Sequence, residues 1–264
     1  MIIDFHTHAF PDKIAEKAIG GLVTSSNSRH TPTTDGTVSD LIRTMDYCGI
    51  DKSVVLPVLT KPSQFEKNCE WIKEIESDRI IPFGGVHPDT EDYKSDIKKL
   101  ASLGIKGIKF HAEFQNFELD SVEMLKLYDF AFENGLLVLH HAGYDPSYSP
   151  PYRATPKRIA NARKQLGGGV FIAAHLGGHD FWDEVEEYLV GSDVYLDTSM
   201  GFQYYSHEQF LRIVKNHGAD KILFGTDTPW SDGKQEIATL NSLPLTQEQK
   251  DKILGKNAQR ILGI

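Results

Sequence analysis

Short apolar runs, rich in Val, Ile and Phe, alternate with longer amphipathic stretches along the whole chain. Almost every position within a run is apolar, which is typical of parallel strands that are buried on both faces. The runs therefore predict eight strands, at Ile2–His6, Asp51–Val58, Ile80–Val86, Ile105–His111, Leu136–His141, Val170–His175, Asp193–Thr198 and Lys221–Thr226.

Between the runs, apolar residues recur at the spacing of an amphipathic helix. In the stretch 38–48, for example, Leu41, Met45 and Cys48 share one helix face. Thr246 followed by Gln249 is a capping box, which marks the start of another helix. The predicted helices are Val38–Cys48, Asp92–Leu103, Ser121–Glu133, Pro156–Leu166, Asp180–Val190, His207–Lys215, Thr246–Leu254 and Asn257–Leu262.

This order of elements predicts an α/β fold, a single (β/α)8 TIM barrel over residues 1–264 with its active site at the carboxyl-terminal ends of the strands. An open doubly wound sheet is the alternative. That fold carries a glycine-rich turn after its first strand, where this chain has His6-Thr7-His8 instead.

Two connections are long and polar, Thr24–Thr37 after a short helix and Gly143–Thr155 after the fifth strand. Long loops at the carboxyl-terminal face of a barrel usually carry function, although a disordered surface loop is the alternative for each.

The composition limits the partners. The chain has 264 residues and a formal net charge of −9, which argues against nucleic acid or an anionic membrane as the main partner. No apolar run approaches the roughly 20 residues of a membrane span. Two cysteines and an opening without a cationic, then apolar, leader predict a cytoplasmic protein. The sequence leaves open whether the protein is a homo-oligomer.

Histidine or aspartate stands at the end of five predicted strands. His6 and His8 end the first strand, two residues apart, so strand alternation places them on the same face together with Asp4. An H-x-H pair by itself is weak, because eleven histidines produce one by chance in roughly half of chains of this length. The other four strand ends strengthen the prediction of a metal site: His111, His140-His141, His175 and Asp227.

These motifs together resemble the amidohydrolase superfamily, in its branch of TIM-barrel metal-dependent hydrolases called amidohydrolase-2. The resemblance covers nearly the whole chain through IDFHTH, GIKGIKFH, GLLVLHHAG, AHLGG, ILFGTDTPW and the closing NAQRILGI. It implies a metal ion that activates water, and it leaves the substrate open.

The resemblance also implies roles for individual residues. His6, His8, His141 and Asp227 are the implied metal ligands, and Asp227 is also the implied proton acceptor. His141 is favoured over His140 because the family frame between Gly135 and Gly143 places it at the ligand position, whereas His140 would pack outward or bond a backbone carbonyl. His175 would bond the attacking water or the substrate, or ligate a second ion. The structural alternative for Asp227 is an N-cap of the segment that follows it.

Four further residues are candidates for substrate binding: Lys109, His111, Arg153 and Trp230. Lys109 and His111 share a strand face that points into the mouth of the barrel, by which we mean its opening at the carboxyl-terminal ends of the strands. Arg153 suits an anionic group. In some superfamily members a lysine at the position of Lys109 is carbamylated and bridges two metals. We favour a cationic lysine that binds a substrate oxyanion or carboxylate, and an ion pair with Asp4 or Glu113 is the structural alternative.

The predicted reaction is hydrolysis of an amide, ester or lactone in a small, possibly anionic substrate. The nitrogen and oxygen ligands suit Zn²⁺ and also accept Mn²⁺, Fe²⁺ or Co²⁺, with one ion favoured and two possible. Non-oxidative decarboxylation of an aromatic or muconate-like acid is the alternative, which the short segment after the first strand disfavours. A metal-binding barrel without catalysis is the third hypothesis.

Overall fold

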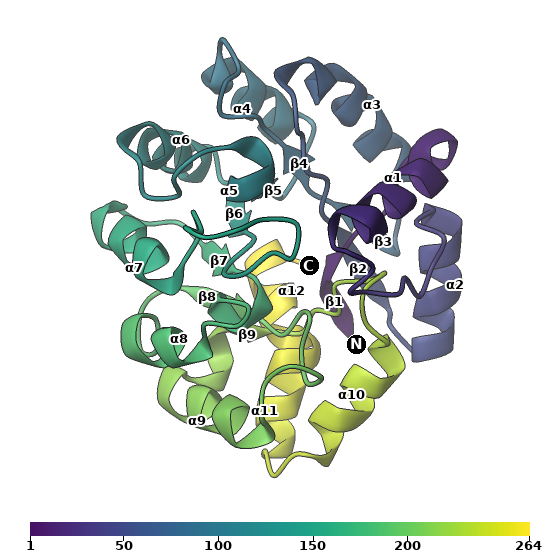
Figure 1. Ribbon diagram of the computed structural model, residues 1–264, viewed down its shortest axis with the longest axis vertical. Coiled ribbons are helices and arrows are strands. Elements are labelled where there is room, and N and C mark those ends of the chain that lie inside the picture. Colours follow the sequence, from purple (N-terminus) through teal and green to yellow (C-terminus); the bar gives the residue numbers. More distant parts are fainter.

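Parallel strands form a ring that is surrounded by helices (Figure 1), as the computed structural model of residues 1–264 shows. This confirms the predicted α/β barrel. The strands are β1 Ile3–Thr7, β2 Lys52–Val55, β3 Ile80–Pro82, β4 Gly84–Gly85, β5 Gly107–Phe110, β6 Leu137–His140, β7 Phe171–Ala173, β8 Tyr195–Asp197 and β9 Ile222–Leu223.

The strands pair in two sheets, in the orders β1-β2-β3 and β4-β5-β6-β7-β8-β9, and backbone contacts join these into one ring. On one side, β3 and β4 are the two halves of the predicted strand Ile80–Val86, which is interrupted after Pro82, a residue without an N–H to donate. On the other side, the Phe5 N–H donates to the Phe224 carbonyl at 2.8 Å, and Thr7 pairs with Thr228. The last strand therefore lies beside the first.

The helices form the outer layer: α1 Asp12–Ser25, α2 Val38–Cys48, α3 Phe65–Ile75, α4 Tyr93–Ser102, α5 Ala112–Gln115, α6 Val122–Glu133, α7 Pro156–Gln165, α8 Trp182–Tyr188, α9 His207–His217, α10 Gly233–Ser242, α11 Gln247–Asp251 and α12 Asn257–Leu262. The sequence analysis did not predict α3, α5 and α10. The two predicted C-terminal helices join through a π-helical turn at Lys252–Lys256, and the predicted Thr246 capping box is present.

Two apolar clusters hold the barrel together. The inner cluster fills the barrel with alternate strand residues such as Phe5, Phe83 and Leu139, and it also includes Ala258 and Leu262 of α12. The larger outer cluster lies between the strands and the helices. This alternation leaves the residues at the carboxyl-terminal strand ends to face the mouth. No helix combines the length and the apolar character needed to cross a membrane.

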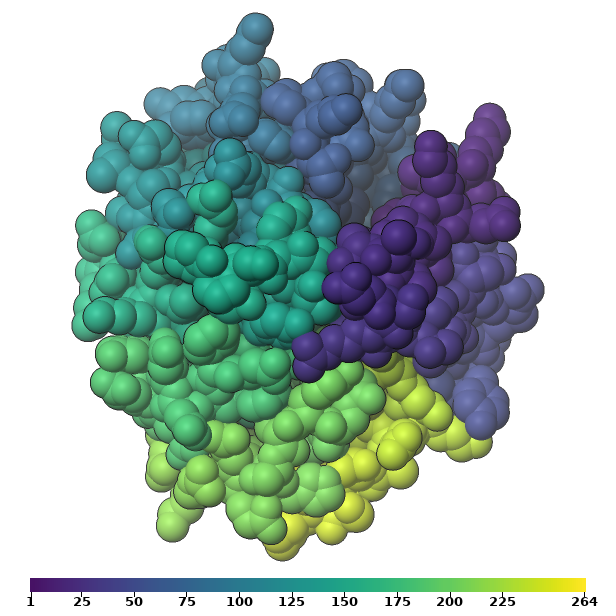
Figure 2. Space-filling view, in the orientation of Figure 1, coloured from purple at the N-terminus to yellow at the C-terminus, as the bar shows by residue number.

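The two long polar connections lie over the mouth. We call residues 26–36 the strap. Its Thr33 N–H donates to the Pro229 carbonyl at 2.7 Å, and its Arg29 guanidinium donates to the Tyr144 hydroxyl at 2.6 Å. In Figure 2 the purple segment after α1 meets teal and green segments near the middle of the molecule. Both connections are therefore packed against the strand ends.

Candidate metal and catalytic site

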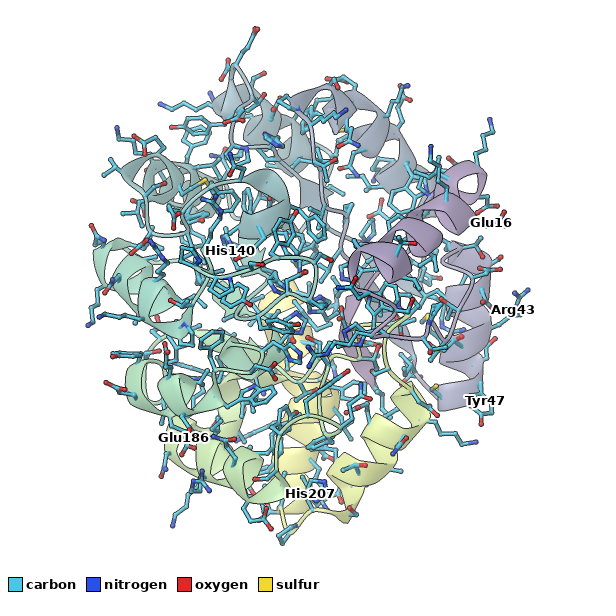
Figure 3. The ribbon with its side chains drawn as sticks, viewed as in Figure 1. Glu16, Arg43, Tyr47, His140, Glu186 and His207 are labelled. Carbon is cyan, nitrogen blue, oxygen red and sulfur yellow. The ribbon has the colours of Figure 1, made fainter.

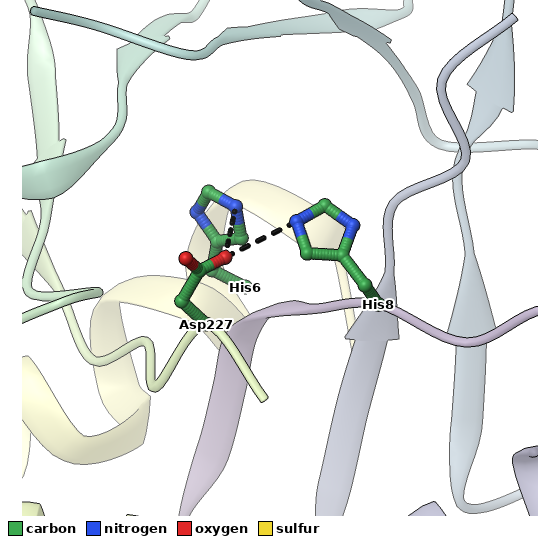
Figure 4. Close-up of side chains that lie close together, drawn as sticks. All are labelled: His6, His8 and Asp227. Carbon is green, nitrogen blue, oxygen red and sulfur yellow. Dashed lines mark ion pairs between the residues drawn. The ribbon is translucent and has the colours of Figure 1, made fainter. Parts of the chain in front are cut away.

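His6, His8 and Asp227 converge at the mouth (Figure 4), although Asp227 is far from the two histidines in the sequence. The Asp227 Oδ1 atom lies 3.2 Å from His6 Nε2 and 3.1 Å from His8 Nε2. The Asp227 N–H donates to the His6 carbonyl at 2.8 Å, and Asp227 has a left-handed backbone with φ of 64°. The pairing of the first and last strands thus brings these three side chains together.

Other groups orient the two imidazoles. His6 Nδ1 donates to Asp197 Oδ2 at 2.8 Å, and His8 Nδ1 donates to the Leu56 carbonyl at 2.9 Å. Each bond places the ring proton on Nδ1 and leaves Nε2 as an acceptor. Two acceptor nitrogens therefore face a carboxylate oxygen, and Asp227 Oδ1 is buried without a hydrogen-bond donor.

This donor set fits a divalent cation. Burial alone would raise the pKa of Asp227, but attraction to His6, His8 and His175 in their protonated forms outweighs it and holds that pKa below its ordinary value of 3.8. At neutral pH, where the rings are unprotonated, the carboxyl is therefore already ionised. An ionised carboxylate and two unprotonated imidazole nitrogens are ligands that Zn²⁺ and other first-row ions accept. A cation between them would satisfy the buried oxygen that the protein leaves without a partner.

The predicted alternation of Asp4, His6 and His8 is only partly confirmed. The register between β1 and β2 shifts between Asp4 and Thr7, and a bulge of this kind redirects side chains. His6 and His8 converge, but the Asp4 carboxylate accepts a hydrogen bond from the Thr226 hydroxyl at 2.6 Å. This bond places the Asp4 carboxyl outside the ligand cluster, and burial raises its pKa to about 7.

Lys109 reaches the cluster from β5. Its Nζ lies 3.1 Å from His6 Nε2, and the side chain is buried, which lowers the pKa of the amine to about 8. Neither of the predicted ion pairs, with Asp4 or Glu113, forms. The Lys109 amine therefore lies at the mouth, beside the proposed ligand His6.

His141 points into the mouth and His140 points away from it, as the family frame predicted. His140, which is labelled in Figure 3, stacks between Phe110 and Phe171, with ring centroids 5.2 and 5.3 Å away, and neither of its ring nitrogens has a hydrogen-bond partner. His141 Nδ1 lies 3.0 Å from His175 Nε2, and His141 Nε2 is buried without a partner. His175 links His141 to the cluster, because its ring centroid is 5.2 Å from that of His6.

A second group of side chains lies beside His141. His111 Nε2 is 3.2 Å from Asp145 Oδ2, and the rings of His111 and His141 stack at 4.0 Å with an angle of 12°. Lone pairs on imidazole nitrogens lie in the ring plane, so two nearly parallel rings do not aim at one ion between them. We therefore interpret His111 and Asp145 as an ion-paired dyad that positions His141.

The remaining candidates have different surroundings. The backbone N–H of Trp230 donates to the backbone carbonyl of Asp227 at 2.8 Å, so Trp230 lies at the mouth. The Arg153 guanidinium donates to Glu118 at 2.9 Å, and the same carboxylate also pairs with Arg158 at 2.8 Å. An anionic substrate group would have to compete with Glu118 for Arg153, so the predicted role of Arg153 stays a prediction.

Sequence analysis missed several residues around the cluster. Asp197, which accepts the hydrogen bond from His6, stands next to last in the predicted strand Asp193–Thr198. Its position near a strand end could therefore have identified it as a site residue. The Ser199 hydroxyl lies between His6 and His175, 3.0 and 2.9 Å from their Nδ1 atoms, after that same strand. Asp145 and His179 lie on loops, where no periodic pattern indicates the direction of a side chain.

The sequence was compared with protein-family models and with curated proteins. A family model described as Amidohydrolase matches residues 3–264, and no curated protein matches the sequence.

Several solved structures share the fold at low identity. An uncharacterised TIM-barrel protein from Bordetella bronchiseptica has a TM-score of 0.77 and 18% identity, covering 99% of this chain and 98% of its own. The 5-carboxyvanillate decarboxylase of Sphingomonas paucimobilis has a TM-score of 0.72 and 13% identity, with coverages of 100% and 99%. A probable 2-pyrone-4,6-dicarboxylic acid hydrolase of Acinetobacter baumannii with citric acid bound has a TM-score of 0.69 and 17% identity, also with coverages of 100% and 99%.

Proposed function

The chain belongs to the amidohydrolase family, and from this premise we propose that it is a metal-dependent hydrolase that cleaves an amide, ester or lactone bond in a small substrate. The observation that carries the proposal is the convergence of His6 Nε2, His8 Nε2 and Asp227 Oδ1, which present three unprotonated donor atoms to one point.

In this proposal His6, His8, Asp227 and His141 hold the ion. His141 is included because its Nε2 is buried without a partner. Zn²⁺ suits this set best, with Mn²⁺, Fe²⁺ and Co²⁺ as alternatives, and we favour a single ion. When bound, the ion polarises a substrate carbonyl and lowers the pKa of water.

The protein's own groups handle the protons. Asp227 accepts a proton from the attacking water and returns it to the leaving group, so that one water is added across the cleaved bond. With His141 Nε2 on the ion, the His141 Nδ1–H donates to His175 Nε2, and the His175 Nδ1–H donates to Ser199, so His175 is a neutral ring that positions His141. The Lys109 ammonium is the donor to the developing oxyanion. His111 and Trp230 lie beside these groups, where they contact the substrate.

The test combines turnover with metal content. We expect Asp227→Asn to lose about 10²- to 10⁴-fold in kcat across a panel of esters, lactones and amides in H₂¹⁸O, because the variant lacks the proton acceptor. Asp78→Asn, an exposed residue before β3, is the matched control. Full turnover by an Asp227→Asn protein that still holds its metal would contradict the proposed role.

Decarboxylation is the second candidate, because a decarboxylase shares this fold over the full length of the chain. Product analysis separates the two reactions. Hydrolysis places one ¹⁸O in the product acid, whereas decarboxylation releases CO₂ and leaves a product without that carboxyl group.

A further inference from the structure

Three side chains beside the proposed ion site carry hydrogen-bond donors and have no acidic partner. Arg29 and His30 belong to the strap, and His179 follows β7. No carboxylate oxygen lies within 4.0 Å of a side-chain nitrogen of any of the three, whereas carboxylates lie that close to His6, His8 and His111.

One aromatic residue, Tyr144, holds the exposed side chain of Arg29 against the loop after β6. Its guanidinium donates to the Tyr144 hydroxyl at 2.6 Å and lies 5.0 Å from the centre of the Tyr144 ring. Tyr144 belongs to the loop after β6, and its N–H donates to the His179 carbonyl at 2.9 Å. The position of Arg29 is therefore fixed without neutralising its charge.

His30 and His179 lie on either side of Tyr204. The Tyr204 hydroxyl is 3.1 Å from His30 Nδ1, and the Tyr204 ring centroid is 4.9 Å from that of His179. His179 is only 3% exposed, and neither of its ring nitrogens has a hydrogen-bond partner. Buried polar groups in folded proteins are nearly always paired, so His179 lacks a partner that a ligand would provide.

His179 also lies next to the proposed catalytic groups, because its ring centroid is 5.9 Å from that of His175. A molecule that contacts His179 therefore extends from the groups around Asp227 toward the strap. The guanidinium and the two imidazoles at this end are donors that suit an anion.

We propose that Arg29, His30 and His179 form a carboxylate subsite, which binds a carboxylate of the substrate remote from the bond that is cleaved. The position of that bond rests on the proposed function. The subsite itself is a binding property, and it can be measured without turnover.

Titration calorimetry on the metal-loaded protein tests the subsite with two probes that contain no hydrolysable bond, benzoate and the uncharged benzyl alcohol. We expect Arg29→Met and His179→Phe each to weaken benzoate binding about tenfold and to change benzyl alcohol binding less than about twofold. Arg43→Met is the matched control, because Arg43 is a surface cation paired with Asp40. It should leave both affinities unchanged.

Two results would overturn the subsite: no preference of the native protein for benzoate, or benzoate binding that both variants retain. A His8→Ala protein without its ion separates this proposal from the function. Benzoate should still bind to it in an Arg29-dependent way. If binding is lost in His8→Ala and kept in Arg29→Met, the carboxylate binds the ion and the subsite is refuted. Absence of turnover with Arg29-dependent binding would refute the proposed function alone.

Discussion

Replacing His140 with leucine should stabilise the protein, and more strongly at acid pH. The imidazole of His140 is fully buried among Phe110, Phe171 and Tyr128, and both ring nitrogens lack partners. Leaving a buried polar atom without a partner costs about 1–3 kcal/mol, and loss of the ring stacking costs about 0.5–1.5 kcal/mol. We therefore expect His140→Leu to raise the free energy of unfolding by about 1–2 kcal/mol at pH 7.

The pH dependence has a defined sign. Burial lowers the pKa of His140 well below 6.5, so below pH 6.5 the unfolded chain takes up a proton that the native state does not. Acid therefore destabilises the native state. Between pH 7 and pH 5 this uptake removes about 2 kcal/mol of stability, which His140→Leu would retain. The combined gain at pH 5 is about 3–4 kcal/mol.

Urea unfolding at pH 7 and pH 5, with a chelator present so that metal release does not contribute, measures both effects. His217→Leu is the contrasting control. His217 is also a buried histidine, but it accepts from the Gly191 N–H and donates to the Val194 carbonyl, so its loss should destabilise the protein at pH 7. An equal loss of stability between pH 7 and pH 5 in native protein and His140→Leu would refute the argument.

Two further predictions concern the metal and the mouth. His6→Ala and His8→Ala should each lose bound metal, measured by mass spectrometry of the purified protein. Chelation should lower the Tm of the native protein but not of these variants. Full metal content in both variants would contradict the ligand assignment. Gly143→Ala should lower the free energy of unfolding by about 3 kcal/mol or more, because φ is 88° and a Cβ would lie 2.3 Å from the His179 backbone nitrogen. Gly104→Ala, with φ of 78° and open space around it, should cost only about 1–2 kcal/mol, and similar losses in a denaturant titration would show that the contact with His179 is unimportant.

The barrel could be predicted because strand burial follows a simple pattern. Alternation along β6 separates His140 from His141, and the order of strands brings the ends of β1 and β9 together. Helices were harder where the apolar pattern is weak. Helix α10 begins at Gly233 and buries only Gly233, Glu236 and Leu240, so little in its sequence indicates an amphipathic helix.

The site was predictable only where it lies on strands. His6, His8 and Asp227 end strands and meet as expected. Asp4 does not join them, because a shift in strand register breaks the alternation, and sequence spacing gives no sign of that shift. The positions of Arg29 and Arg153 depend on which loops contact each other, so sequence alone could not show that Glu118 pairs with Arg153 while Arg29 stays unpaired.

The closure of the ring between β1 and the segment after β9 has a consequence for how the protein matures. The imidazoles of the proposed ion site, His6, His8 and His141, all precede its carboxylate, Asp227, in the sequence, so a nascent chain holds the imidazoles before it holds the carboxylate. High-affinity capture of the ion must therefore wait until the segment that carries Asp227 has been synthesised and has paired with β1. Once captured, the ion would tie the two ends of the barrel together, and its loss would loosen the fold first at the seam where the ring closes.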